Sequence, residues 1–143
     1  MTVSLTNIFG IAATALNAQT VRLNVTASNL ANAGTTASSE SAAFKGKRPV
    51  FEALLAQEQT NAGAQQVGGV KIARIVDDKT PAQRVYDPGH PDADANGFLY
   101  RSNVSEVGEM VEMMAAARSF QNNVEVFNTA RDLMLRSLDT LKN

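Results

Sequence analysis

A hydrophobic repeat of seven residues fills the C-terminal part of the chain and strongly limits what the chain can fold into. Two lines of the repeat can be followed, Met110, Ala117, Val124, Arg131 and Leu138, and, three residues further on, Met113, Phe120, Phe127, Met134 and Leu141. Every one of these residues except Arg131 is apolar. A repeat sustained over more than four heptads predicts a long helix that packs along another helix. The pattern fits a coiled coil and an ordinary helical bundle equally well.

A weaker repeat of the same period lies near the start of the chain, at Phe9, Leu16, Leu23 and Leu30. The first 44 residues carry only two charged side chains, and most of their polar positions are Asn, Thr or Ser. Neutral polar groups can be buried between helices if they form hydrogen bonds, whereas unpaired charges cannot. This composition favours a helix surrounded by protein on most sides. The alternatives are a solvated helix and a disordered tail.

The residues between the two repeats predict a small β element. A polar stretch, 34–39, is typical of a loop that ends the first helix. The segment 44–55 contains Pro49 and predicts either a short helix beginning at Val50 or an extended edge strand. Further short strands are predicted at 70–76, 84–86 and 98–100. The fold predicted is mainly α with a small inserted β element, divided into residues 1–36, 37–102 and 103–143.

Composition excludes several classes of function. With 13 Lys and Arg against 14 Asp and Glu, the net charge of -1 gives no electrostatic drive toward nucleic acid or an acidic membrane surface. The absence of Cys and the single His exclude a disulfide scaffold and any zinc site that needs two such ligands. The first 21 residues contain no Lys or Arg, and no apolar run is long enough to span a bilayer. We therefore expect neither a cleaved signal peptide nor a membrane segment.

One polar segment, 87–97, resembles the start of a calcium-binding loop. Asp92, Asp94 and Asn96 occupy alternate positions, but the twelfth position is Asn103 where such a loop needs a bidentate Glu. We interpret the segment as a turn-rich connection, because Asp, Asn, Gly and Pro all favour turns. A self-contained, calcium-responsive helical binding module is the alternative hypothesis. His90 has no marked nucleophile nearby, so we predict no enzyme activity and no catalytic, cofactor or metal site.

Several motifs together resemble the rod and hook proteins of the bacterial flagellum. They are spread over nearly the whole chain: Leu16 to Gln19, Asn24 to Ala33 with its Asn-Leu-Ala-Asn, Phe44-Lys45, Lys47 to Glu52, Asp87 to Pro91, Gly97 to Tyr100, Asn103 to Val111, and Arg118 to Val126. The short chain and the Asp-Pro-Gly-His-Pro segment are similar to the proximal-rod members, not to the longer distal-rod or hook proteins.

The resemblance implies a fold, a location and a set of partners. It implies that the long N- and C-terminal helices pair as a coiled coil, and that the subunit polymerises into the drive shaft that crosses the periplasm. The implied partners are copies of the chain itself, other rod proteins, the membrane-ring adaptor at the rod base and the flagellar type III export apparatus. Nucleic acid and direct membrane insertion are not among them.

The resemblance also assigns residues to the helix seam. It sets the N-terminal line of Phe9, Leu16, Leu23 and Leu30 against the line that begins at Met113, and the seam is predicted to include Met110, Met113, Phe120, Val124, Phe127, Met134, Leu138 and Leu141. Asn29 and Asn32 match the family motif. They are expected to form hydrogen bonds at the helix end or between subunits.

Overall fold

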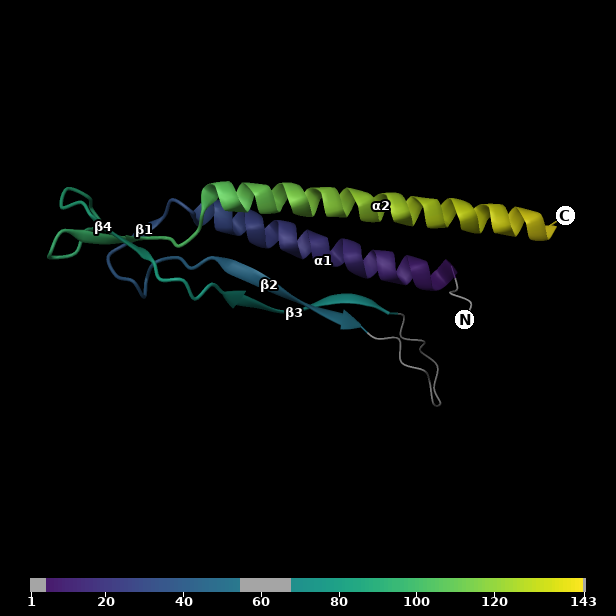
Figure 1. Ribbon diagram of the computed structural model, residues 1–143, viewed down its shortest axis with the longest axis horizontal. Helices are drawn as coiled ribbons and strands as arrows, with labels where there is room; N and C mark the ends of the chain where they lie inside the picture. Colours follow the sequence, from purple (N-terminus) through teal and green to yellow (C-terminus); the bar gives the residue numbers. More distant parts are fainter. Residues whose placement is uncertain (1–4, 55–67, 143) are drawn as a thin grey trace, which may run out of the picture.

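Two long antiparallel helices dominate the computed structural model, which describes residues 5–54 and 68–142 (Figure 1). Helix α1 spans Leu5–Asn32 and helix α2 spans Glu106–Lys142. The strands between them are β1 (Thr36–Ala37), β2 (Lys47–Leu54), β3 (Gly69–Asp77), β4 (Gln83–Tyr86) and β5 (Phe98–Arg101). Two long terminal helices packed together with a small β region are therefore confirmed. Within the described ranges, neither helix has the length and hydropathy needed to cross a membrane.

Helix α1 forms the middle of three layers. Helix α2 lies along one side of it, and the hairpin of β2 and β3 lies along the other (Figure 1). The two strands pair antiparallel, from Lys47 opposite Asp77 to Leu54 opposite Gly69, with a register shift between Val50 and Phe51. The buried apolar residues of α1 are small, apart from one valine: Ala12, Ala18 and Val25. Coverage on two sides explains why a 28-residue helix carries almost no charge.

A second, three-stranded sheet lies at the end of the molecule where α1 finishes and α2 begins (Figure 1). Its strand order is β1-β5-β4, with both pairings antiparallel. The ring of Phe98 packs edge-on against Tyr86 at 5.1 Å, and the guanidinium of Arg84 lies 3.7 Å from the centre of the Phe98 ring. The strands expected at 84–86 and 98–100 are confirmed.

The segment around Pro49 is a strand, which decides between the two structures that its sequence allowed. Residues 47–54 form β2, and the strand expected at 70–76 lies within β3.

At the start of α2, the hydroxyl of Ser105 accepts a hydrogen bond from the backbone N–H of Gly108 at 3.3 Å, so Ser105 is the N-cap. The side chain of Asn103, two residues earlier, bonds to the backbone of Gly46 and Thr80.

The hairpin approaches α1 closely at Gly69, where β3 begins. The Thr14 hydroxyl donates to the carbonyl of Ile11 and accepts from the backbone N–H of Val70 at 3.2 Å. A Cβ on Gly69 would lie 2.4 Å from that hydroxyl oxygen and 3.3 Å from the Thr14 Cβ. Glycine is therefore needed at position 69 for the hairpin to reach the helix.

We predict that Gly69→Ala lowers the free energy of unfolding by about 1–3 kcal/mol, because the added methyl group overpacks the contact with Thr14. Urea denaturation measures the change. Adding Thr14→Ala should recover part of the loss. Gly89→Ala is the matched control, since its nearest atom would be 3.6 Å away. Equal losses for Gly69→Ala and Gly89→Ala would contradict the close approach.

Candidate assembly site

The interface between α1 and α2 contains an aromatic pair that sets the register of the helices. The rings of Phe9 and Phe127 meet edge-on, with their centres 5.0 Å apart. Because both helices rise by the same distance per residue in opposite directions, each step of seven along α1 corresponds to seven back along α2. In this register Leu16 lies at the same level as Phe120, and Leu23 at the same level as Met113. All four of these predicted seam residues are half-buried.

The most buried line of α2 lies one residue before the first line of the heptad pattern. It consists of Glu109, Ala116 and Ala130, with 2%, 0% and 4% of their surface exposed, and of the half-buried Asn123. These residues alternate with the line of Met113, Phe120 and Phe127 at heptad spacing. Small alanines let α1 approach closely, which is why the tightest contact does not follow the largest side chains.

Several predicted seam residues are not covered within one subunit. Met110, Met134 and Leu138 are 47%, 37% and 48% exposed. Val124 and Leu30 are half-buried. The side chain of Leu141 lies outside the described residues. A single helix pair therefore covers Met113, Phe120 and Phe127 in part and leaves Met110, Met134 and Leu138 open to solvent.

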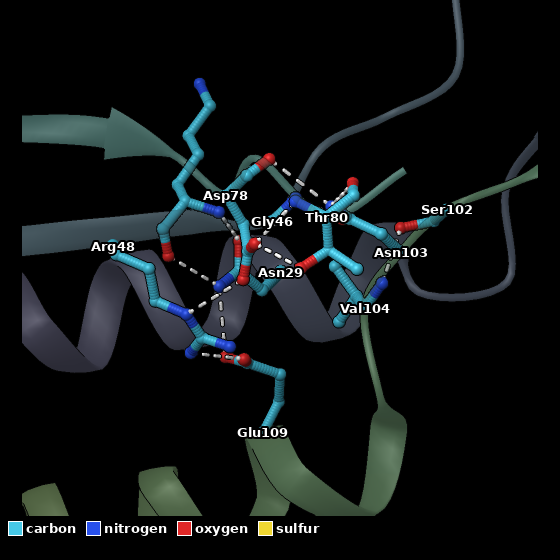
Figure 2. A network of polar contacts seen from close by, with 10 residues as sticks. Asn29, Gly46, Arg48, Asp78, Thr80, Ser102, Asn103, Val104 and Glu109 are labelled. Atoms are coloured by element: carbon cyan, nitrogen blue, oxygen red, sulfur yellow. Dashed lines mark hydrogen bonds and ion pairs between the residues drawn. The ribbon is translucent and has the colours of Figure 1, made fainter. Parts of the chain in front are cut away.

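A buried amide joins α1, β2 and α2 (Figure 2). The side chain of Asn29 is fully buried, and its Nδ2 donates to the backbone carbonyl of Lys47 at 2.9 Å and to Oε2 of Glu109 at 3.0 Å. In return, the backbone N–H of Lys47 donates to Oδ1 of Asn29 at 2.8 Å. The amide thus uses both of its N–H donors and its carbonyl oxygen.

The carboxylate of Glu109 is held from two sides. Its Oε1 accepts a hydrogen bond from the Arg48 guanidinium at 2.7 Å, and its Oε2 accepts the bond from Asn29. Glu109 also lies in the first turn of α2, where the helix dipole favours negative charge. We call the four residues Asn29, Lys47, Arg48 and Glu109 the polar clamp. A second ion pair, Arg22 with Glu112, joins the helices further along the same face.

The loops behind the polar clamp hold the start of β2 in place (Figure 2). Oδ1 of Asn103 accepts from the N–H of Gly46 at 2.7 Å, and its Nδ2 donates to the Thr80 carbonyl at 2.7 Å. The carbonyl of Gly46 accepts from the N–H of Asp78. The Asp78 carboxylate accepts from the hydroxyl of Thr80 at 2.7 Å and from its N–H at 2.9 Å. These two bonds hold the pKa of Asp78 below its usual value, and the positive charge of Arg48 acts in the same direction.

Sequence reasoning found only part of the polar clamp. It selected Asn29 and Asn32, and the structure places Asn29 at the centre, whereas Nδ2 of Asn32 donates to the Ser28 carbonyl within α1. It missed the roles of Arg48 and Glu109. Glu109 shares a heptad line with alanines, and an acidic residue on such a line is a signal that could have revealed the buried ion pair.

The segment 87–97 uses its polar side chains to stabilise turns. Oδ1 of Asp94 accepts from the N–H groups of Asn96 and Phe98 at 2.8 and 2.9 Å, and the carboxylate of Asp92 accepts from the hydroxyl of Thr36. Nδ1 of His90 accepts from the N–H of Asp92 at 3.1 Å. In the part of the chain that the structure describes, no three acidic, His or Cys side chains are grouped to hold a metal ion.

Comparison with known proteins identifies the class to which this helix pair belongs. Residues 9–37 match the family model of flagella basal body rod proteins, and residues 95–140 match the model of the C-terminal region of flagellar basal body rod FlgEFG proteins. The two matches cover most of α1 and α2. The resemblance of the chain to flagellar rod proteins is therefore confirmed.

Full-length relatives identify the family within that class. The chain is 46% identical to the flagellar basal-body rod protein FlgC of Salmonella typhimurium, over 94% of the chain and 96% of that relative. It is 47% identical to FlgC of Yersinia enterocolitica over the same shares, and 31% identical to FlgC of Bacillus subtilis over 90% of the chain and 93% of the relative. The chain belongs to the FlgC family of flagellar basal-body rod proteins.

Removing the amide of the polar clamp should destabilise the fold. We predict that Asn29→Ala lowers the free energy of unfolding by about 2–4 kcal/mol, since the backbone groups of Lys47 and Oε2 of the buried Glu109 lose their hydrogen bonds to the amide. Asn29→Asp should cost at least as much at neutral pH, because it adds a second carboxylate beside Glu109. Chemical denaturation provides the measurement. The control is Asn24→Ala on the exposed side of α1, expected within about 0.5 kcal/mol of the unchanged chain; a similar loss there would contradict the prediction.

The low pKa of Asp78 makes the loops behind the polar clamp sensitive to acid. Because folding lowers this pKa, its stabilising contribution is complete above the unfolded value of about 3.9 and is lost as pH falls through the lower folded value. Thr80→Ala removes the hydroxyl bond and should raise the pKa of Asp78 toward its usual value in a carboxyl-carbon NMR titration. Asp94, whose pKa is lowered chiefly by the Phe98 N–H, is the internal control and should not move. An unchanged Asp78 titration would refute the assignment.

Proposed function

We propose that this chain is a structural subunit of the flagellar basal-body rod whose α1 and α2 pack as a coiled coil, within the subunit and against its neighbours. The observation that carries the proposal is family membership over nearly the whole chain, matched to a helix pair that is only partly covered in one subunit. In this role no bond is made or broken. The chain transmits torque because its helices pack rigidly between neighbours, and no catalytic, cofactor or metal site takes part.

The exposed apolar surface of α2 supports assembly through this helix. Helix α2 has 37 residues against 28 in α1, and it continues past the first described residue of α1 (Figure 1). Its exposed large apolar side chains are Val107, Met110, Val111, Met114, Val126, Leu133, Met134, Leu135 and Leu138. Exposed apolar surface of this extent marks interaction sites, and neighbouring subunits in a rod would cover it.

The polar clamp supports a role in stiffness. Sliding α2 along α1 by one turn would separate Glu109 from Asn29, and rotating the hairpin would separate Arg48 from Glu109. Each movement leaves a buried charge without its partner, which costs about 3–5 kcal/mol. A subunit that resists sliding and twisting between its layers suits a shaft that must turn as one body.

The proposal includes partners inside and outside the rod. Copies of this chain, other rod proteins and the membrane-ring adaptor at the rod base would contact the assembled subunit, and the flagellar type III apparatus would export it. The net charge of -1 gives no attraction to nucleic acid. The alternative of a calcium-responsive module is not supported, since the relatives are rod proteins and Asp94 is engaged in turns.

Charges placed in the helix seam test the proposal. Leu23→Asp and Phe120→Asp should each abolish swimming, because an unpaired buried charge costs about 3–5 kcal/mol. Export of the subunit should stay largely intact. Swimming in soft agar and recovery of the chain in purified basal bodies are the two measurements. Asn24→Asp and Gln121→Asp introduce the same charge at exposed neighbouring positions and should leave cells motile. Motile cells carrying either seam variant would rule out the coiled-coil seam.

A further inference from the structure

Near its start, helix α2 carries an exposed apolar stripe that faces away from α1. We call Val107, Val111 and Met114 the outer ridge; their side chains are 71%, 55% and 57% exposed. Their spacing of four and then three residues places them in one line along the helix. The buried residue Glu109 lies two positions after Val107, on the opposite side of α2. The outer ridge is therefore not part of the interface between α1 and α2.

Further along α2, a groove opens beside the seam. It has a volume of about 480 Å³ and is lined by Ile8, Asn122, Glu125, Val126, Thr129, Ala130 and Leu133. Val126, Ala130 and Leu133 repeat the four-then-three spacing of the outer ridge. Ala130 is nearly fully buried and forms the floor, whereas Val126 and Leu133 are each 52% exposed and form the wall. Because Ile8 belongs to α1, the groove continues the established interface between the helices.

We propose that the outer ridge of one copy of this chain seats in the groove of a second copy, with the two α2 helices parallel and displaced by nineteen residues. Val107 then meets Val126, Val111 enters above Ala130, and Met114 meets Leu133. A branched side chain above a small floor residue is the complementarity seen in knobs-into-holes packing. This inference rests on the proposed function, and it names the partner of the exposed face of α2.

Within one copy the outer ridge and the groove cannot meet, because nineteen residues of helix span about 28 Å. The two surfaces also lie on different sides of α2. Joining the ridge of one copy to the groove of the next leaves a free ridge and a free groove at the ends. Such a contact adds copies without closing into a ring or a dimer, as a shaft requires.

Engineered cysteine pairs test this contact in purified basal bodies. The chain contains no Cys, so the new thiols are the only ones it carries. After oxidation, Val107→Cys combined with Val126→Cys should give a ladder of dimers, trimers and larger species on a non-reducing gel. The bond must join different copies, because a disulfide requires Cα atoms within about 7 Å. Met114→Cys combined with Leu133→Cys should give the same ladder, and it tests the displacement independently.

The matched control keeps Val107→Cys and moves the second cysteine to another side of α2. Asn128 is exposed and lies two residues from Val126, so Val107→Cys combined with Asn128→Cys should give no ladder. A ladder from the control, dimers that never extend, or bands that contain a different protein would each overturn the proposal. The proposal would also be overturned if each double-cysteine chain were present in basal bodies and neither formed a cross-link. Absence of the chain from basal bodies of wild-type cells would contradict the proposed function instead.

Discussion

The burial of one carboxylate determines how the rest of the subunit is arranged. Glu109 is almost fully removed from water, and it is stable there because Asn29 and Arg48 each donate a hydrogen bond to it. These donors come from α1 and β2, so the charge is satisfied only when all three elements are in place. The polar clamp therefore specifies which residue of α1 lies beside which residue of α2, a choice that apolar heptads alone leave open.

Helix α1 owes its unusual composition to its position between two partners. An ordinary surface helix has one apolar stripe, whereas α1 has α2 on one side and the β2–β3 hairpin on the other. Alanines such as Ala12 and Ala18 allow close approach, and neutral polar residues such as Thr14 and Asn29 form bonds to the hairpin backbone. A charged side chain on either face would lose its hydration without a partner.

Local sequence patterns predicted the helices and strands of this fold. The polar clamp could not be predicted in the same way, because it is formed by residues that are distant in the sequence. The heptads predicted both long helices, and Phe127 of the predicted seam lies against Phe9. The most buried line contains Glu109, not Met110, because small residues and a paired charge pack closer to α1 than a large side chain does. Arg48 and Glu109 are 61 residues apart in sequence, so no local pattern could bring them together.

The pairing of α1 with α2 also determines when the chain can begin to hold its shape. The residues opposite Phe9 lie in α2, far behind it in the sequence, so a ribosome makes α1 well before the residues on which it packs. Until then, α1 has emerged without the surface on which it packs, and a helix of this composition is marginal alone. The packing of α1 against α2 is therefore gained only after α2 itself has been made.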